Sequence, residues 1–586
     1  ENVLFFIQSF QNQINDIIRI MCGIVALFSK KLYREDLNFA KTALRTIAHR
    51  GPDNRSLINY NNRCILGHNR LSIIDLNKNS NQPMENKNFS LVYNGMLYNY
   101  IELKKELQRR NYLFKTNSDT EVILNSYMEW GVSSFKKFRG MFSIVIYDLK
   151  KHKIIFSRDH LGIKPLYYKI VKKKIFICSE IKPLTEIDNI KYNDKAIYNY
   201  LKHDFYETQE NTFFKNIFQV MPGYAYIYKL NSKFKKEKYW SLYETIKNNK
   251  NYFSLKKTKL ILKSHFKNIS EMYIRSDVKS GLLLSSGIDS NVLKKILETK
   301  YKNLNYFTFG FKNSNNDEIK KIKLHKKKRQ NHHTQRYDLK KTLHNLNFIQ
   351  KVQEMPFGGF NVVFLTLLMK IAKKKGNKVM FIADGADELF GGYKKYSKCN
   401  INQKDYYLRS IDGTKSEKLY IKNNFEKKFK HKISIKYPSK NNLINQRYFD
   451  FVYNKLPRNF RFSDRYSMIN SIELRYPFLD YKLVEDSFRI NPKHLIKNDN
   501  YKKIITDIFN IKQKKQHLNS PQIDWFYNIK FKKFLSSKLK NSAIFSKYLD
   551  KKKTMKQIEE YYNSKSKNSF HIWKILNLHL FLELYK

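Results

Sequence analysis

The stretch Met21-Cys22-Gly23-Ile24-Val25-Ala26-Leu27-Phe28 places a cysteine directly after a methionine and ahead of a short apolar run. The run has high β-propensity, so it predicts a strand that begins beside the thiol. Removal of Met21 would leave Cys22 with a free α-amino group, which pairs a thiol nucleophile with an amine of pKa about 8. A lone cysteine in a strand is more often a packing residue. The rest of the chain decides between these interpretations.

Length and composition indicate a folded chain of two or more domains. At 586 residues it exceeds the size at which one hydrophobic core keeps growing. The formal net charge of +61 invites a nucleic-acid-binding interpretation. However, the excess is mostly lysine spread along the chain, and it accompanies 41 Tyr, 43 Phe and only 18 Gly, the pattern that AT-rich codons produce. We therefore expect no nucleic-acid partner.

The cysteines and the apolar runs favour a cytoplasmic protein. The cysteines at 22, 64, 178 and 399 lie far apart and form no CxxC pair, so we expect neither disulfides nor a structural metal. No apolar run approaches the roughly 20 residues of a membrane helix, so we expect no membrane partner. Residues 1–20 lack the basic start and cleavage site of a secretory signal. We expect residues 1–21 to be a mis-assigned extension with Met21 as the true start, or else a propeptide.

The first half of the chain alternates short apolar runs with two helical patterns. Helical spacing over 32–47 ends at the turn motif HRGPD (49–53). We expect strands at 64–66, 71–76, 89–93, 141–147, 154–157 and 175–179. Many short strands with few helices predict a layered α+β domain whose edge carries Cys22.

Three polar positions follow these runs, and each could also have a purely structural role. Arg70 could hold a carboxylate bidentately, or form a surface pair. Asn94-Gly95 offers an amide and a bare backbone N–H, the parts of an oxyanion hole, but also suits a type I′ turn. Asp119 could bind an ammonium group, or cap a helix that runs to Met128.

Taken in order, Cys22, HRGPD, RLSIID (70–75), YNG (93–95), SDTE (118–121) and RDHLGIKPLYY (158–168) resemble the glutaminase domain of the N-terminal-nucleophile amidotransferases. The resemblance covers residues 22–240 and implies an αββα sandwich in which Cys22 attacks the side-chain amide of glutamine. It implies that Asn94 and Gly95 stabilise the oxyanion. The implied glutamine-binding residues are Arg70, Leu71, Ser72, Ile73, Ile74, Asn94, Gly95, Met96 and Asp119.

Met96 departs from this resemblance, because the family pattern is NGEIYN and its Glu helps to bind the amino group of the substrate. Asp119 alone would then carry the charge. A charge-assisted contact of this type contributes on the order of 1.5–3 kcal/mol, which is about one to two decades in affinity. We therefore expect weaker glutamine binding.

Two glycine-containing loops in the second half follow predicted buried strands. Gly281–Leu284 runs into SSGIDS (285–290) and a helix expected to begin near Asn291, an arrangement that cradles phosphate. An ordinary strand-turn-helix fits equally well but does not explain Asp289. The strand 379–382 runs into ADGADE (383–388), and carboxylates beside a phosphate cradle suit Mg²⁺.

SSGIDS resembles SGGxDS, the pyrophosphate loop of the ATP pyrophosphatases, with Ser286 at the first Gly, a mild change only if φ is negative there. With DRYSM (464–468), ELRYPFLD (473–480) and Lys502, which we place in a helix, residues 22–530 resemble the glutamine-dependent asparagine synthetase family. This implies an α/β parallel-sheet ATP-pyrophosphatase domain over 241–586. The implied ATP-binding residues are Leu284, Ser285, Ser286, Gly287, Asp289, Ser290, Phe309, Ile382 and Ala383.

The same resemblance implies ATP and Mg²⁺ as cofactors, with Asp289 and Asp387 holding the metal. It implies that Asp384 helps to form the acyl-adenylate and that Lys502 stabilises charge in the transition state. Two departures stand out. Ile382-Ala383 replaces a Ser-Gly pair, and Thr506 stands where an Arg is expected.

These features predict an asparagine synthase that hydrolyses glutamine and passes the ammonia to an adenylated carboxylate. Aspartate is the default acceptor for the family. The segment 353–360 lies where the family varies, so another carboxylate, such as a uronic acid of a surface polysaccharide, is the first alternative. A degenerate paralogue without glutaminase activity is the second. A homodimer is a further expectation.

Overall fold

The computed structural model describes residues 22–206, 209–230, 232, 234–249, 251–312, 317–322, 330–397, 417–430, 435–497, 500–511, 521–564 and 568–585. The predicted extension 1–21 lies outside these residues. Among the residues described, no helix is long and apolar enough to cross a membrane.

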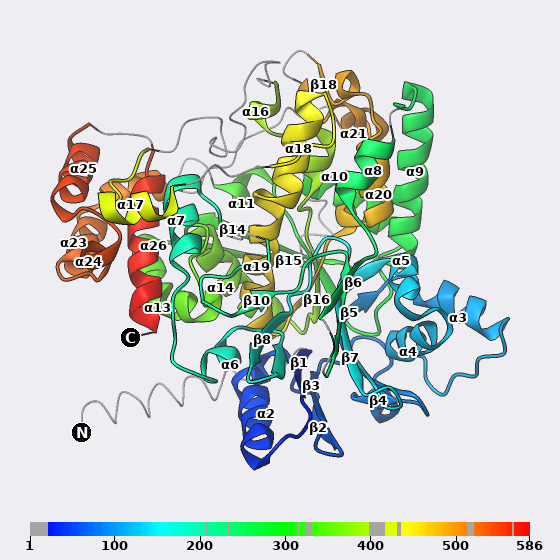
Figure 1. Cartoon of the computed structure of the whole chain (residues 1–586). Coiled ribbons are helices and arrows are strands. Elements are labelled where there is room, and N and C mark those ends of the chain that lie inside the picture. The colour runs from blue at the N-terminus through cyan, green and yellow to red at the C-terminus, as the bar shows by residue number, and fades with distance from the viewer. Residues whose placement is uncertain are drawn as a thin grey trace.

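Two six-stranded antiparallel sheets form the first half of the chain (Figure 1). The first sheet has the order β10-β8-β9-β1-β3-β2 and the second β12-β11-β7-β6-β5-β4. The strands are β1 (Gly23–Phe28), β2 (Asn54–Tyr60), β3 (Cys64–Arg70), β4 (Met84–Glu85), β5 (Phe89–Leu97), β6 (Gly140–Asp148), β7 (Lys153–Arg158), β8 (Tyr167–Val171), β9 (Lys174–Cys178), β10 (Phe218–Gln219), β11 (Tyr224–Lys229) and β12 (Lys235–Lys238).

The alternation along β1 builds the layers. Ile24, Ala26 and Phe28 pack into the core between the two sheets, while Val25 and Leu27 pack with the apolar face of α2, because successive side chains of a strand point to opposite faces. Helices α3 and α4 cover the second sheet on its far side (Figure 1). This confirms the predicted αββα sandwich. Its helices are α2 (Arg34–Thr46), α3 (Tyr100–Gln108), α4 (Asp119–Trp130), α5 (Ser134–Lys137), α6 (Lys182–Thr185) and α7 (Asp194–His203).

A five-stranded parallel sheet of order β15-β14-β13-β16-β17 forms the centre of the second half. This confirms the predicted α/β fold. The strands are β13 (Ser280–Leu283), β14 (Asn305–Phe311), β15 (His332–Tyr337), β16 (Val379–Phe381) and β17 (Glu473–Arg475), with a separate hairpin of β18 (Ile496–Lys497) and β19 (Asn500–Tyr501).

Helices surround this sheet, and α14 and α19 pack against each other over β14 and β17. Those before α22 are α8 (Leu242–Asn248), α9 (Leu255–Met272), α10 (Ile288–Glu298), α11 (Glu318–Lys321), α13 (Leu339–Gln353), α14 (Asn361–Lys374), α15 (Ala386–Phe390), α16 (Lys394–Ser397), α17 (Asn423–Phe429), α18 (Asn442–Val452), α19 (Lys455–Met468), α20 (Tyr481–Ser487) and α21 (Lys503–Ile508). The domain boundary at 240/241 stays a prediction.

The segment after residue 530, which lies beyond the resemblance, is helical where the structure describes it. It comprises α23 (Ile529–Leu539), α24 (Ile544–Lys547), α25 (Lys551–Ser564) and α26 (Phe570–Leu584), preceded by α22 (Gln522–Tyr527). The α26 helix is buried along most of its length, and the indole N–H of Trp573 donates to the carbonyl of Phe357 at 2.9 Å. The C-terminal helices therefore fix the segment 353–360 in place.

Several local predictions are wrong. Residues 71–76 form no strand, and Asn94-Gly95 lies inside β5 and not in a turn. The cap of α4 is Ser118, with Asp119 as the first helical residue. Helix α10 begins at Ile288, three residues earlier than expected. Lys502 precedes α21 in a left-handed conformation, φ +60°, and is not helical.

Candidate active sites

The structure gathers the predicted glutamine-site residues around one cavity at the start of β1. The thiol Sγ of Cys22 lies 3.3 Å from the backbone N–H of Leu71, which donates to it. Ser72 is the one predicted residue that does not line this cavity, and its N–H instead donates to Asp53 at 2.8 Å. The lining residues are Cys22, Arg70, Leu71, Ile73, Ile74, Ser80, Gln82, Tyr93, Asn94, Gly95, Met96, Ser118, Asp119, Thr120 and Glu473.

Close packing of strands β5 and β6 explains the glycine beside Asn94. A Cβ atom on Gly95 would lie 2.1 Å from the carbonyl oxygen of Met141 on β6, so no other residue fits. The side-chain oxygen of Asn94 is buried and has no hydrogen-bond partner among the described residues. An amide group that is buried beside a cysteine and incompletely bonded is available to a ligand.

The two charged residues expected to hold the ends of glutamine, Arg70 and Asp119, already form hydrogen bonds with other residues of the protein. Asp119 accepts hydrogen bonds from the Leu97 N–H and the Tyr93 hydroxyl, each at 3.0 Å. Burial nevertheless raises the pKa of Asp119 to about 6. The guanidinium of Arg70 donates to the carbonyl of Asn77 at 2.7 Å and to the side chain of Asn81 at 2.9 Å. Arg70 is therefore buried and holds the loop that follows it, so the surface-pair alternative is wrong.

The cavity is small, and burial favours the protonated form of the thiol. Its volume is about 30 Å³, room for about two water molecules, so glutamine enters only if the surrounding loops move. Burial raises the pKa of Cys22 to about 11. A nucleophilic role for this thiol therefore needs a base close by.

A chain of buried ion pairs joins the Cys22 region to the second domain. Arg50 donates through Nε to the carbonyl of Cys22 at 3.2 Å, and its terminal nitrogens donate to both oxygens of Asp464 on α19 at 2.8 and 3.0 Å. Arg50 also pairs with Glu180 at 2.9 Å. Arg465 continues the chain to Glu354 at 2.8 Å.

Arg50 lies in the motif HRGPD and Asp464 and Arg465 lie in DRYSM, but the sequence did not predict that these charges pair. Sequence reasoning also missed Glu473, which comes from β17 of the second domain and lines the cavity beside Cys22. The sequence signal for Glu473 was its place at the start of ELRYPFLD, one of the motifs that carried the resemblance.

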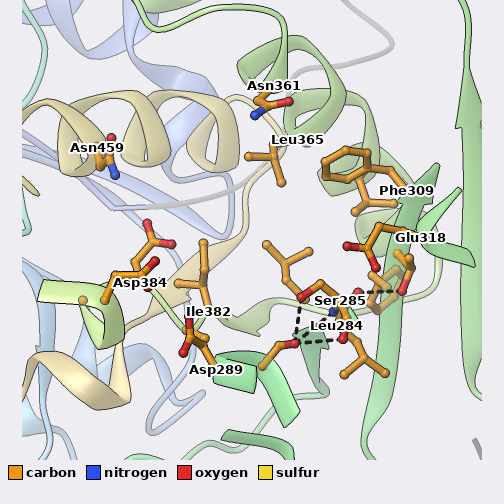
Figure 2. Close-up of a pocket in the computed structure, with 18 of the residues that line it drawn as sticks. Leu284, Ser285, Asp289, Phe309, Glu318, Asn361, Leu365, Ile382, Asp384 and Asn459 are labelled. Carbon is orange, nitrogen blue, oxygen red and sulfur yellow. Dashed lines mark hydrogen bonds between the residues drawn. The ribbon is translucent and has the colours of Figure 1, made fainter. Parts of the chain in front are cut away.

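A second cavity of about 340 Å³, large enough for a ligand, lies at the carboxyl ends of β13, β14 and β16 (Figure 2). It brings together most of the residues predicted to bind ATP. The exceptions are Ser286 and Gly287, which belong to the same loop but do not line the cavity. The lining residues are Leu283, Leu284, Ser285, Asp289, Ser290, Phe307, Thr308, Phe309, Phe311, Glu318, Asn361, Leu365, Leu368, Ile382, Ala383, Asp384, Gly385, Asp387, Glu388, Tyr393, Leu456 and Asn459.

Two serine side chains of the loop between β13 and α10 form hydrogen bonds with the backbone of the same loop. The Ser285 N–H donates to the Ser290 hydroxyl, and the Gly287 N–H donates to the Ser285 hydroxyl, both at 3.1 Å. Ser286 is not among the residues with positive φ, so its side chain is tolerated where the pattern has a glycine. Its N–H donates to the carboxylate of Glu318 at 2.7 Å.

Lys502 sits between the two predicted metal ligands. Its Nζ lies 2.5 Å from an oxygen of Asp289 and 2.5 Å from an oxygen of Asp387. Burial alone would lower the pKa of Lys502, but the two carboxylates outweigh it and hold that pKa above its ordinary value. Burial, with Asp387 and Asp289 nearby, raises the pKa of Asp384 to about 7.

These carboxylates fit a hard divalent cation, since they already attract a positive charge and supply oxygen ligands. Across the described residues no group of three His, Cys, Asp or Glu side chains is arranged to hold a metal. A magnesium ion here would therefore complete its shell with oxygens from phosphate and water.

An αββα domain with a cysteine at its first strand, joined to a parallel sheet with a glycine-containing loop after β13, is the architecture expected of an amidotransferase coupled to an ATP-using synthetase. Residues 21–240 match the family described as glutamine amidotransferase domain, and residues 262–583 match the family described as asparagine synthase. The chain belongs to the asparagine synthase family, as its motifs predicted.

Curated relatives agree on this family but differ in name. The glutamine-hydrolysing asparagine synthetase 1 of Bacillus subtilis is 29% identical and the match covers 64% of this chain and 59% of that protein. The glutamine-hydrolysing asparagine synthetase 3 of the same organism is 26% identical over 82% of this chain and 83% of that protein. Amidase chry2 of Gibberella zeae is 27% identical over 66% of this chain and 61% of that protein. Similarity at this level does not fix one acceptor.

Proposed function

We propose that this protein uses ATP to activate a carboxylate and amidates it with ammonia released from glutamine. The single observation that carries the proposal is that one chain holds both cavities, one beside Cys22 and one beside a phosphate loop with buried carboxylates and a lysine. ATP would be split to AMP and pyrophosphate, because adenylation supplies the leaving group that a free carboxylate lacks.

In the first cavity Cys22 would attack the side-chain amide of glutamine and form a γ-glutamyl thioester. The buried thiol has a raised pKa, so its proton has to pass to a base, and the α-amino group of Cys22 would serve once residues 1–21 are absent. Asn94 and Gly95 would stabilise the oxyanion through the side-chain N–H of Asn94 and the backbone N–H of Gly95. The side-chain NH2 of Asn94 makes one long hydrogen bond, to the Ser143 hydroxyl at 3.5 Å, which supports this role.

The ends of glutamine would be held by the two charged residues of the same cavity. Arg70 would bind the α-carboxylate and Asp119 the α-ammonium group. Arg70 would have to give up its hydrogen bonds to Asn77 and Asn81 in order to bind the substrate. The same movement of the loop would enlarge the cavity enough to admit glutamine. Leu71, Ile73, Ile74 and Met96 would line the remainder.

In the second cavity the phosphate loop would bind the pyrophosphate end of ATP through Ser285, Gly287 and Ser290. Leu284, Phe309, Ile382 and Ala383 would lie against the nucleoside. Asp289 and Asp387 would hold Mg²⁺, which when bound would offset phosphate charge. Lys502 would stabilise the charge that develops on phosphate, and Asp384 would assist formation of the acyl-adenylate.

Aspartate is the first acceptor to test, because it is the family's default and several similar proteins are named asparagine synthetases. A uronic acid is the second, because the segment 353–360 lies where the family varies and leads into α14, which contributes Asn361 to the cavity lining. A homodimer and a cytoplasmic location are further parts of the proposal.

The test is pyrophosphate release from ATP with each carboxylate, once with ammonia and once with glutamine. The proposal expects release with at least one acceptor and both nitrogen sources. Release with ammonia alone would support the paralogue without glutaminase activity. No release with any carboxylate would overturn the proposal.

A further inference from the structure

Both domains contribute to the cavity beside Cys22. Glu473 is the first residue of β17, and every other described residue that lines this cavity lies between positions 22 and 120. The backbone N–H of Glu473 donates to the carbonyl of Lys378 at 2.9 Å, and its side chain is 3% exposed. The parallel sheet of the second domain therefore adds a buried carboxylate to a site that the first domain otherwise builds.

The charged residues at this cavity are one cation and two acids. Among the described lining residues, Arg70 is the cation, and Asp119 and Glu473 are the acids. The two acids lie close enough to repel each other, because the charge of Glu473 adds to the effect of burial, which is the main reason that the pKa of Asp119 is raised to about 6. A cation placed between the two carboxylates would remove this repulsion.

An ion pair fixes the Glu473 side chain. The Nε of Arg475 donates to Oε1 of Glu473 at 2.9 Å, and Nη1 of Arg475 donates to the carbonyl of Tyr273 at 2.7 Å. The bond to Oε1 uses a fraction of the capacity of a carboxylate, which can accept about four hydrogen bonds. Arg475 therefore holds the carboxylate in place and offsets the cost of burying it, while acceptor capacity remains for a ligand.

We infer that Glu473 binds the α-ammonium group of glutamine together with Asp119, so that the second domain completes the glutamine site. The inference rests on the proposed function. An ammonium group has three N–H donors and one positive charge, and two carboxylates that line one cavity match both properties. Met96 lines the same cavity and supplies no charge to this contact. Glu473 would thus select amides that carry an α-amino group.

The experiment compares glutamine with glutaramate, which is glutamine without its α-amino group. Ammonia release is measured without ATP or acceptor, on protein that starts at Cys22. We expect kcat/KM of the wild type to be at least 100-fold higher for glutamine than for glutaramate. Glu473→Gln should lower that ratio at least tenfold, through a higher KM for glutamine, because glutaramate cannot make the contact that is lost. A ratio is insensitive to the fraction of folded protein.

Asp464→Asn is the matched control. Asp464 is also a buried carboxylate of the second domain that pairs with an arginine, and it is not among the residues that line the Cys22 cavity. Its ratio should stay within threefold of the wild type. A ratio for Glu473→Gln within threefold of the wild type, or an equal fall in Asp464→Asn, would overturn the inference and leave the proposed function standing. Ammonia release from neither amide by the wild type would overturn the proposed glutaminase function, and the inference with it.

A second variant covers the case in which Glu473→Gln does not fold. Loss of one partner of a buried ion pair leaves the other charge unpaired, so Arg475→Met is combined with Glu473→Gln to remove both charges. The ratio should fall at least tenfold in this double variant as well. A ratio within threefold of the wild type would contradict the role assigned to Glu473.

Discussion

Replacing Asp464 by Asn tests the buried ion pairs that join the two domains. Asp464 accepts two hydrogen bonds from Arg50 and one from Arg465, and the side chains of Arg50 and Asp464 are 0% and 4% exposed. Asparagine keeps the shape of the side chain and removes its charge. The substitution therefore leaves two buried guanidinium groups with one fewer carboxylate.

The magnitude follows from burial. Removal of one partner of a buried ion pair costs about 3–5 kcal/mol, because the other charge stays desolvated. Arg50 retains Glu180 and Arg465 retains Glu354, so we expect the lower end, about 3 kcal/mol. For domains of this size that corresponds to a fall of about 6–12 °C in Tm.

The assay is thermal unfolding followed by circular dichroism, with Glu106→Gln as the control. Glu106 pairs with Lys137 at the surface, where the two side chains are 36% and 40% exposed, so that variant should change stability by less than about 1 kcal/mol. A Tm for Asp464→Asn no lower than that of Glu106→Gln would refute the reasoning.

The pH dependence gives a second check. Burial alone would raise the pKa of Asp464, but Arg50 outweighs it and holds the pKa below its ordinary value. The stabilisation is therefore present above the unfolded-state pKa of about 3.9 and lost as pH falls through the folded-state value. The Tm gap between the wild type and Asp464→Asn should narrow only below about pH 4.

Three further predictions concern the two cavities. Cys22→Ala should abolish glutamine-dependent pyrophosphate release and leave ammonia-dependent release intact, and loss of both would argue against the assigned role. The pKa of Asp119 is about 6, and its ionised form would bind the ammonium group, so kcat/KM for glutamine should fall below pH 6. A flat profile between pH 5 and 8 would count against Asp119. Lys502→Gln should reduce pyrophosphate release at least 10³-fold, more than 4 kcal/mol of barrier, while glutaminase activity measured as glutamate release persists; equal loss of both activities would indicate misfolding.

The sequence predicted fewer than half of the described strands, but these include β1, β5, β13 and β16 beside the two cavities, because the motifs lie at strand ends and parallel or paired strands bring those ends together. The error at 71–76 is instructive. Ile73 and Ile74 are apolar because they are buried at the Cys22 cavity, and not because they belong to a sheet. An apolar run reports burial, and only the pairing partner decides whether it is a strand.

The partners across the domain interface could not be predicted in the same way. Arg50 and Asp464 are separated by 414 positions, and neither charge indicates its partner through local spacing. The position of the Lys502 ammonium group could not be predicted from the sequence either, because it lies between two acidic residues contributed by α10 and α15.

Two departures from the family pattern, at Met96 and at Ile382, both lie close to strand β17. Glu473 at its start lines the Cys22 cavity, and the carbonyl of Arg475 at its end accepts a hydrogen bond from the Ile382 N–H at 3.0 Å. Ile382 lines the nucleotide cavity, and its contact with β17 is made by the backbone, so the change from Ser to Ile leaves that contact intact. Met96 and Glu473 line the same cavity, and the Glu473 carboxylate there pairs with Arg475 at 2.9 Å. One short strand of the second domain therefore touches both sites, and substitutions that leave its backbone contacts in place preserve the arrangement on which both activities would depend.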